Sequence, residues 1–194
     1  MREAIRIIKD EHTAIAAVLH GLRYLAREAV QKKQPADFRV LHAMLDYIVA
    51  FPERLHHPKE DRYLFRAVRE RNPEAASLIE RLEAEHVKGD RMLKRLQEAL
   101  LAYERDPTSE QATEFAKIVD EYFDFHWKHM TQEEDQLLPL AERVLEDEDW
   151  EHIERAFREN DNPLFGLRPK EELSALFHRV VNIAPPPIGL GPAP

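Results

Sequence analysis

The sequence predicts an all-α protein: an up-down-up-down four-helix bundle with a short helical C-terminal extension and a Pro-rich tail. Four long segments repeat apolar residues at spacings of three, four and seven, the period of a helix with one buried face. Clusters of Pro, Asn and Asp separate these segments, and the 194 residues contain only five glycines. Each segment is longer than an average globular helix, as a bundle requires.

The four helices are expected at about 2–31, 37–71, 73–105 and 109–147. The first ends at QKKQPAD, where Asp37 can cap the second helix. The sequence RNPE ends the second, because Asn72 can cap the third helix and Pro73 fits its first turn. RDPTSE separates the third helix from the fourth.

The last part of the chain has a different pattern. Residues 148–194 are expected to form an extension packed on the bundle of residues 1–147, not a second domain. EDEDWEHIERAFREN and PKEELSALFHRVVN each predict a short helix, with a turn at DNPLFG between them. The final APPPIGLGPAP predicts an extended tail.

Composition excludes several classes of protein. A net charge of −9 argues against nucleic-acid binding, which needs a basic face. No apolar run approaches the roughly 18 residues of a membrane span. The charged start MREAIRIIKDEH has no apolar signal region, so a cytoplasmic location is expected. The absence of Cys excludes disulfides, thiolate metal ligands and Cys nucleophiles.

Each expected helix carries one histidine on its buried apolar stripe. These residues are His12, His56, His86 and His129. Along the chain they lie at nearly matching distances from the connecting loops. In an up-down bundle their levels would therefore agree to within about 3 Å. The four imidazoles are expected to converge on one layer of the core.

Two glutamates share the faces of two of these histidines. Glu60 follows His56 by four residues, and Glu133 follows His129 by four, within the similar segments HHPKEDRYLF and HMTQEEDQLL. The second and fourth helices run the same way, so both carboxylates are displaced toward the same end of the bundle. Carboxylates facing each other in an apolar core are unstable without counter-charge, and a pair of divalent cations supplies it.

The ligand count fits two Fe ions, with Mn or Zn as alternatives. Two octahedral irons offer about twelve positions, which two bridging carboxylates, four imidazoles and one oxo or hydroxo bridge fill except for about two. The free positions would suit a small exogenous ligand.

A competing pattern is the Glu-x-x-His of ferritin-like di-metal proteins, seen in ERLH (53–56) and EAEH (83–86). That architecture needs the two motifs on alternate helices and a lone inward Glu on each of the others. Here the motifs fall on consecutive helices, and the other two helices offer His12 and His129. The histidine-layer interpretation is therefore favoured.

Four segments resemble the ligand segments of the hemerythrin family, specifically the bacterial hemerythrin-like (HHE cation-binding) domains. They are DEHTAI (10–15), HHPKEDRYLF (56–65), EAEH (83–86) and HMTQEEDQLLP (129–139). The resemblance covers about residues 2–147. It implies a non-heme di-iron site whose ligands are His12, His56, Glu60, His86, His129 and Glu133.

The chain departs from the animal oxygen carriers of this family, which have five histidines, two of them as His-x3-His on the third helix. Here the residue four after His86 is Asp90. A fifth imidazole could come from His126 or His57, or Asp90 or water takes that position. Asp61 is a further candidate near the site, as an outer acceptor or a surface charge. Pro52 and Pro58 predict a distorted helix around the site.

Three functions share this ligand set. We expect binding or sensing of O2 or NO at the di-metal centre. The alternatives are a di-iron redox enzyme that reduces peroxide or NO, and iron storage or stress-related metal handling. The sequence shows no general acid or substrate pocket that decides among these functions. Whether the protein is an enzyme is left open, and binding or sensing is the favoured interpretation. The expected partners are O2, NO or peroxide, with a second copy of the chain as a candidate protein partner.

Overall fold

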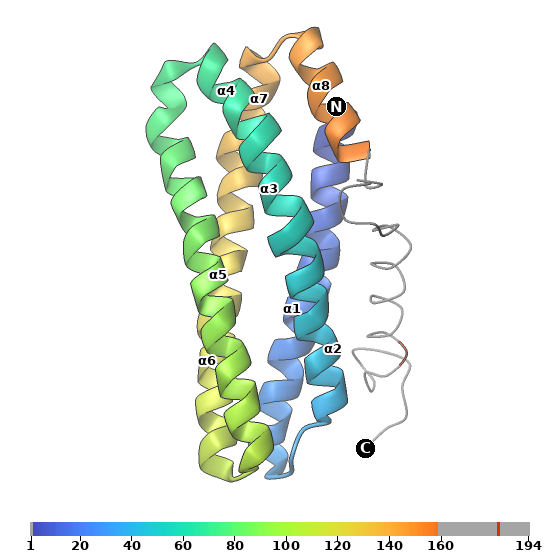
Figure 1. Cartoon of the computed structure of the whole chain (residues 1–194), viewed down its shortest axis with the longest axis vertical. Coiled ribbons are helices and arrows are strands. Elements are labelled where there is room, and N and C mark those ends of the chain that lie inside the picture. Colours follow the sequence, from blue (N-terminus) through green and yellow to red (C-terminus); the bar gives the residue numbers. More distant parts are fainter. Residues whose placement is uncertain (1, 159–181, 183–194) are drawn as a thin grey trace.

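The computed structural model describes residues 2–158 and residue 182, and within them the chain is almost entirely helical, with no strand. The expected all-α class is therefore confirmed. Four helical rods lie side by side, and each runs back along the one before it (Figure 1). The second short helix expected at 169–182 and the tail at 184–194 lie outside the described residues, apart from residue 182.

The rods follow the expected boundaries closely. The first is α1 (Glu3–Lys32), and the third is η3 (Pro73–Ala75) with α5 (Ala76–Arg105). The expected caps are confirmed, because the Asp37 carboxylate accepts a hydrogen bond from the Arg39 amide and the Asn72 side chain accepts one from the Glu74 amide. The fourth rod comprises α6 (Ser109–Gln132), η4 (Glu133–Leu137) and α7 (Leu138–Val144).

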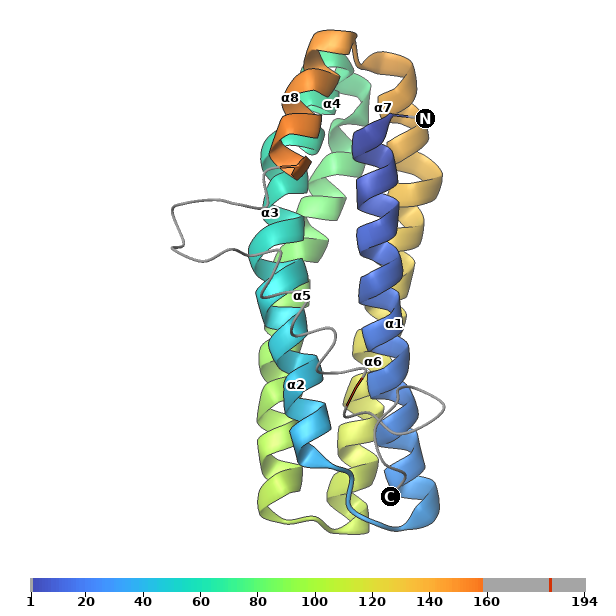
Figure 2. The same cartoon turned by 90° about the vertical axis from the view of Figure 1, so that its right-hand side faces the viewer.

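The fourth rod ends three residues before the expected 147, because a new helix starts there. Leu145 has an extended backbone, and the Asp149 carboxylate accepts a hydrogen bond from the Glu146 amide at 2.9 Å. This contact begins α8 (Asp147–Arg158), which packs against α1 near its start (Figure 2).

The second rod is helical throughout but is not a regular α-helix. It comprises α2 (Phe38–Ile48), η1 (Val49–His56), α3 (His57–Lys59), η2 (Glu60–Phe65) and α4 (Arg66–Arg71), of which η1 and η2 are π-helical. The segment η4 of the fourth rod is π-helical as well. The distortion expected from the prolines is thus present as a wider helix.

The apolar core is divided into two clusters. One surrounds the end of the molecule with the loops after α1 and α5, and includes Leu22, Leu41, Leu96 and Phe115. The other lies at the α8 end and includes Ile8, Leu82 and Trp150. The buried histidines and glutamates lie between the clusters along every rod, so a polar layer crosses the core at mid-height.

Within the described residues, no helix combines the length and the apolar character that crossing a membrane would require.

We expect Trp150→Ala to lower the free energy of unfolding by about 3–5 kcal/mol, because it removes a large side chain of α8 that is only 1 % exposed. Urea denaturation followed by circular dichroism measures the loss. Trp127→Ala is the matched control, since Trp127 is 48 % exposed, and it should cost less than about 1 kcal/mol. Equal losses in the two variants would show that α8 is not part of the cooperative core.

Candidate metal centre

Six side chains meet in the polar layer, from all four rods. They are His12 of α1, His56 and Glu60 of the second rod, His86 of α5, and His129 and Glu133 of the fourth rod. All six are buried; Glu60 is fully buried, and Glu133 and His56 are each 1 % exposed. Three overlapping groups of these residues and His57 place potential ligand atoms within 4.8 Å of one another.

The Glu60 carboxylate faces imidazoles on both sides. Its Oε1 lies 3.5 Å from His56 Nε2 and 3.8 Å from His12 Nε2. Its Oε2 lies 3.6 Å from His86 Nε2. One carboxylate therefore presents each of its oxygens to a different set of imidazoles.

The Glu133 carboxylate repeats this arrangement from the opposite rod. Its Oε2 lies 3.4 Å from His12 Nε2, on the same side as Glu60 Oε1. Its Oε1 lies 3.2 Å from His129 Nε2 and 3.7 Å from His86 Nε2. The centre thus has two halves, one at His12 and His56 and the other at His86 and His129, with both carboxylates shared between them.

None of the four shared carboxylate oxygens has a hydrogen-bond donor among the described residues, and His12 Nε2 is likewise unpartnered. Buried polar atoms without partners each cost about 1–3 kcal/mol, and charged ones more. Oxygen and imidazole nitrogen atoms are the donors that Fe, Mn and Zn accept. The unpartnered atoms point at one another rather than at packed side chains, and this donor set fits two divalent cations.

The other ring nitrogen of each histidine is bound to an acid from a neighbouring rod. His12 Nδ1 donates to Glu134 of the fourth rod at 3.0 Å, and His56 Nδ1 donates to Glu11 of α1 at 2.8 Å.

The same pattern continues around the molecule. His86 Nδ1 donates to Asp61 of the second rod at 2.8 Å, and His129 Nδ1 donates to Glu85 of α5 at 3.0 Å. Each rod therefore gives an acid to the histidine of the next, and the last closes on the first. We call Glu11, Asp61, Glu85 and Glu134 the carboxylate ring. Such hydrogen bonds fix the tautomer and leave Nε2 free for a metal.

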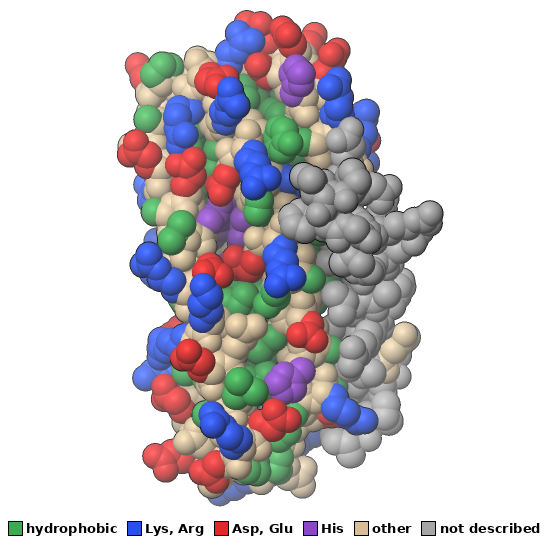
Figure 3. Space-filling view, in the orientation of Figure 1, with side chains coloured by type: hydrophobic (Ala, Val, Ile, Leu, Met, Phe, Trp, Pro, Cys, Tyr) green, Lys and Arg blue, Asp and Glu red, His purple; other side chains and the backbone are tan. Residues whose placement is uncertain are grey.

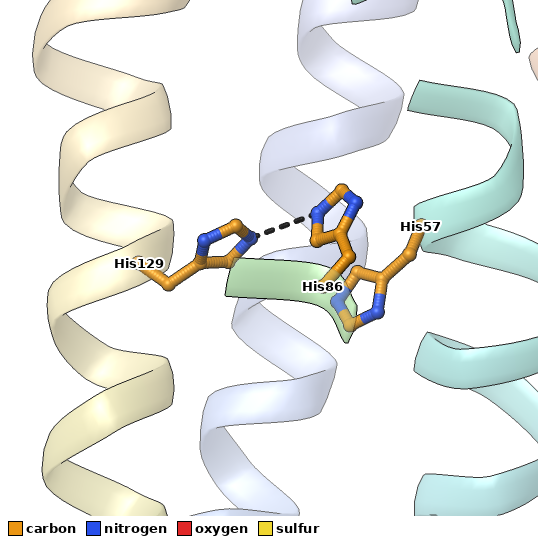
Figure 4. Close-up of side chains that lie close together, drawn as sticks. All are labelled: His57, His86 and His129. Atoms are coloured by element: carbon orange, nitrogen blue, oxygen red, sulfur yellow. Dashed lines mark hydrogen bonds between the residues drawn. The ribbon is translucent and has the colours of Figure 1, made fainter. Parts of the chain in front are cut away.

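His57 is a third imidazole in the half formed by His86 and His129. The three rings lie together in Figure 4, where a dashed line joins the Nε2 atoms of His86 and His129 at 3.0 Å. His57 stacks on His86 with ring centroids 4.2 Å apart. Its Nδ1 lies 3.6 Å from an oxygen of Glu53, a longer version of the acid contact that supports the other four.

Three other candidates from the sequence do not join a ligand group within the described residues. Asp90 pairs with Lys94 at 2.6 Å and is half-exposed. His126 is buried beside Tyr122, and a Cβ on Gly89 would come within 3.2 Å of its ring, so glycine makes room for it. Asp61 acts through His86 rather than as a ligand. Of the proposed fifth imidazoles, the structure brings His57 to the site and leaves His126 beside it.

Charge explains the pKa values in the layer. Burial alone would lower the pKa of His12, His86 and His129, but the neighbouring carboxylates outweigh it and raise the pKa of all three. Asp61 and Glu133 raise the pKa of His86 to about 10, and Glu133 with Glu85 raises that of His129 to about 9. The pKa of His12 is likewise raised well above its usual value. Without metal, these protons supply the positive charge that cations would provide.

His57 and His126 differ from these three. Burial and the neighbouring imidazoles lower the pKa of His57 well below its usual value and that of His126 to about 3, so both rings are neutral. A neutral imidazole is the form that binds a metal without first losing a proton. His57 is therefore the member of its half that needs no deprotonation.

The π-helical segments lie at the site, and prolines explain two of them. Proline lacks an N–H, and in an α-helix its ring clashes with the carbonyl four residues earlier. Ahead of Pro58, the His57 N–H instead bonds the Pro52 carbonyl, five residues back. Ahead of Pro139, the Leu138 N–H bonds the Glu133 carbonyl in the same way. Both wide turns occur in the two rods that carry His-x3-Glu.

The layer is close to the surface on one side. Figure 3 shows histidine side chains at mid-height between charged and apolar neighbours, on the face formed by the second and third rods. By contrast, His20 and His42 lie away from the centre: His20 packs on Phe123 and His42 bonds Glu104.

Comparison with known families identifies one match. Residues 3–141 match the family model described as Hemerythrin HHE cation binding domain. No curated protein matches the chain significantly. The matched region contains all six residues of the centre, His57 and the carboxylate ring.

We expect Glu11→Gln to weaken metal binding by about 10- to 100-fold, because the variant removes the charged acceptor of the His56 Nδ1 proton. Competition with a coloured chelator measures the affinity. Asp10→Asn is the matched control one residue away, since Asp10 is exposed and pairs only with Arg6 among the described residues. Equal affinities for the parent and Glu11→Gln would contradict a supporting role for the ring.

We expect the free energy of unfolding of the metal-free protein to fall by at least about 2 kcal/mol between pH 7 and pH 9.5. The pKa values of His86 and His129 are raised in the folded chain, to about 10 and about 9. Their protonated forms therefore stabilise the fold below pH 6.5, and this contribution is lost as the pH rises through the folded values. Urea titrations in a chelator test it; the zinc-loaded protein should lack the fall, and a flat metal-free profile would disprove it.

Proposed function

Because the chain belongs to the hemerythrin HHE cation-binding family, we propose that it is a non-heme di-iron protein that binds or senses O2 or NO. In this proposal residues 1–147 form an up-down-up-down four-helix bundle that holds the metals, and residues 148–194 form its extension. One observation carries the proposal: two buried carboxylates, each with its two oxygens facing different imidazoles.

This arrangement favours two cations over one. A single ion in either half would engage one oxygen of Glu60 and one of Glu133, and would leave the other two oxygens buried without a partner. Two ions use all four. Carboxylates placed symmetrically between two sets of imidazoles are what a bridged pair of metals needs.

The ligand set we propose is His12, His56, Glu60, His86, His129 and Glu133, with His57 as the fifth imidazole. His57 belongs in this set because it lies in a potential ligand group with His86 and His129 and has its own acid, Glu53. Adding it to the coordination count leaves about one free position instead of two. That position falls in the half with fewer imidazoles, at His12 and His56.

When bound, the irons supply reversible one-electron chemistry and a Lewis-acidic position for a small ligand. The protein residues have three tasks around them. The carboxylate ring holds the Nδ1 protons and so orients each Nε2 inward. The two apolar clusters keep bulk water from the layer. The bridging carboxylates neutralise the cations where no solvent can.

Binding or sensing is favoured over turnover because each imidazole is already fixed by an acid and apolar clusters pack on either side of the layer. Peroxide or NO reduction is the alternative that the second test below would reveal, and iron handling is a further alternative. The choice of iron over Mn or Zn is part of the proposal. A cytoplasmic location and a homodimer stay predictions from the sequence.

We expect aerobically purified protein to contain about two Fe per chain, and the double variant His56→Ala, Glu60→Ala to contain nearly none, because it removes one imidazole and one bridge. Elemental analysis by mass spectrometry measures the content. The matched control is His42→Ala, Glu104→Ala, which removes an exposed His–Glu pair distant from the layer. Unchanged metal in the site variant would end the di-metal proposal.

The function itself is tested on the reduced, iron-loaded parent protein. Reversible, stoichiometric binding of NO or O2 with return of the starting spectrum supports binding or sensing. Continuous consumption of NO or peroxide with an added reductant would instead identify a redox enzyme.

A further inference from the structure

A surface cavity of about 250 Å³ lies between α1 and the fourth rod, and His12 forms part of its wall. The remaining wall combines apolar with polar groups: Ala16, Trp127 and Met130 with Thr13, Glu134 and Asp135. This side of the molecule is opposite the face seen in Figure 3, because α1 and α6 lie behind the second and third rods in that orientation. The cavity opens to solvent yet touches a residue of the buried layer.

His12 connects the cavity to the centre. Its side chain is 3 % exposed and lines the cavity, while its Nε2 lies 3.4 Å from Glu133 and 3.8 Å from Glu60. His12 Nδ1 donates to Glu134, which is itself part of the cavity wall. A molecule in the cavity is therefore one imidazole away from the shared carboxylates.

We propose that this cavity is the access site through which small neutral molecules reach the metal centre, with Ala16 setting its width. The inference rests on the proposed function, since it concerns how a ligand reaches that centre. The half of the centre at His12 and His56 has two imidazoles, whereas the other half has three. The half beside the cavity is therefore the one with the free coordination position.

The wall chemistry indicates the class of molecule. Ala16, Trp127 and Met130 give the cavity an apolar surface. An uncharged diatomic molecule moves from water onto such a surface at little cost in free energy. Glu134 and Asp135 place negative charge at the same cavity, which disfavours anions. Lys9 lies 3.8 Å from Glu134 and offsets part of the Glu134 charge. Asp135 is exposed, and its charge still repels an anion.

The test uses NO as the neutral probe and azide as the anionic one, with the iron-loaded full-length protein. Ala16→Leu narrows the cavity, and should slow both association and dissociation of NO by at least about fivefold while Kd changes less than about twofold. Stopped-flow absorbance measures both rates. Ala17→Leu is the matched control, because Ala17 is the next residue on α1, is exposed and does not line the cavity.

Two further variants change the width and the charge of the cavity. Trp127→Ala widens the cavity and should raise both NO rates. Asp135→Asn should speed azide association by about two- to threefold and leave NO association unchanged, because the Asp135 carboxylate repels the azide anion but not the neutral NO molecule. NO rates that match the parent in both Ala16→Leu and Trp127→Ala would overturn the inference and indicate access from the face in Figure 3.

Failure of the inference is separable from failure of the proposed function. A parent protein that holds no iron contradicts the proposed function. The cavity is then tested alone by xenon under pressure in crystals of the metal-free protein, with a peak expected between Ala16, Trp127 and Met130 in the parent and none in Ala16→Leu. Absence of xenon from the parent cavity would overturn the inference by itself.

Discussion

The burial of two carboxylates, Glu60 and Glu133, is the constraint on which the rest of the structure depends. An isolated carboxylate in an apolar interior costs so much free energy that it would normally protonate. Here the surrounding imidazoles lower the pKa of Glu133 well below its usual range despite its burial, so the charge is kept. Positive charge must therefore remain in the layer, either as protons on His12, His86 and His129 or as metal ions.

The carboxylate ring extends this charge balance to the outer surface of the layer. Each acid binds the histidine of the next rod, so the ring joins all four neighbouring pairs of rods at one height. An apolar contact tolerates sliding between helices, whereas a hydrogen bond to a ring nitrogen fixes both register and rotation. The layer is consequently both the site and the feature that aligns the rods, and the apolar clusters on either side supply most of the packing free energy.

Much of this arrangement could be predicted from sequence, because helical period and loop position are local properties. They place His12 and its three counterparts at one level, where the structure also has them. The ring was harder to foresee. Glu11 and Glu85 each directly precede a site histidine, and in a helix that step turns a side chain by about 100° toward the neighbouring rod. The sequences DEH and EAEH contain these glutamates, but a glutamate before a histidine can be identified as a hydrogen-bond acceptor only when the histidine of the adjacent rod is known.

His57 shows why helix type matters to the site. In a regular α-helix, consecutive residues such as His56 and His57 point about 100° apart, so one faces inward and the other does not. The π-helical turns around Pro58 change that rotation, and both imidazoles are buried, in opposite halves of the centre. The π-helical segments η1 and η2 of the second rod thus bring a fifth imidazole to the layer without a fifth helix. The same turns explain why proline is tolerated here: it lacks the one hydrogen bond that a wide turn no longer needs.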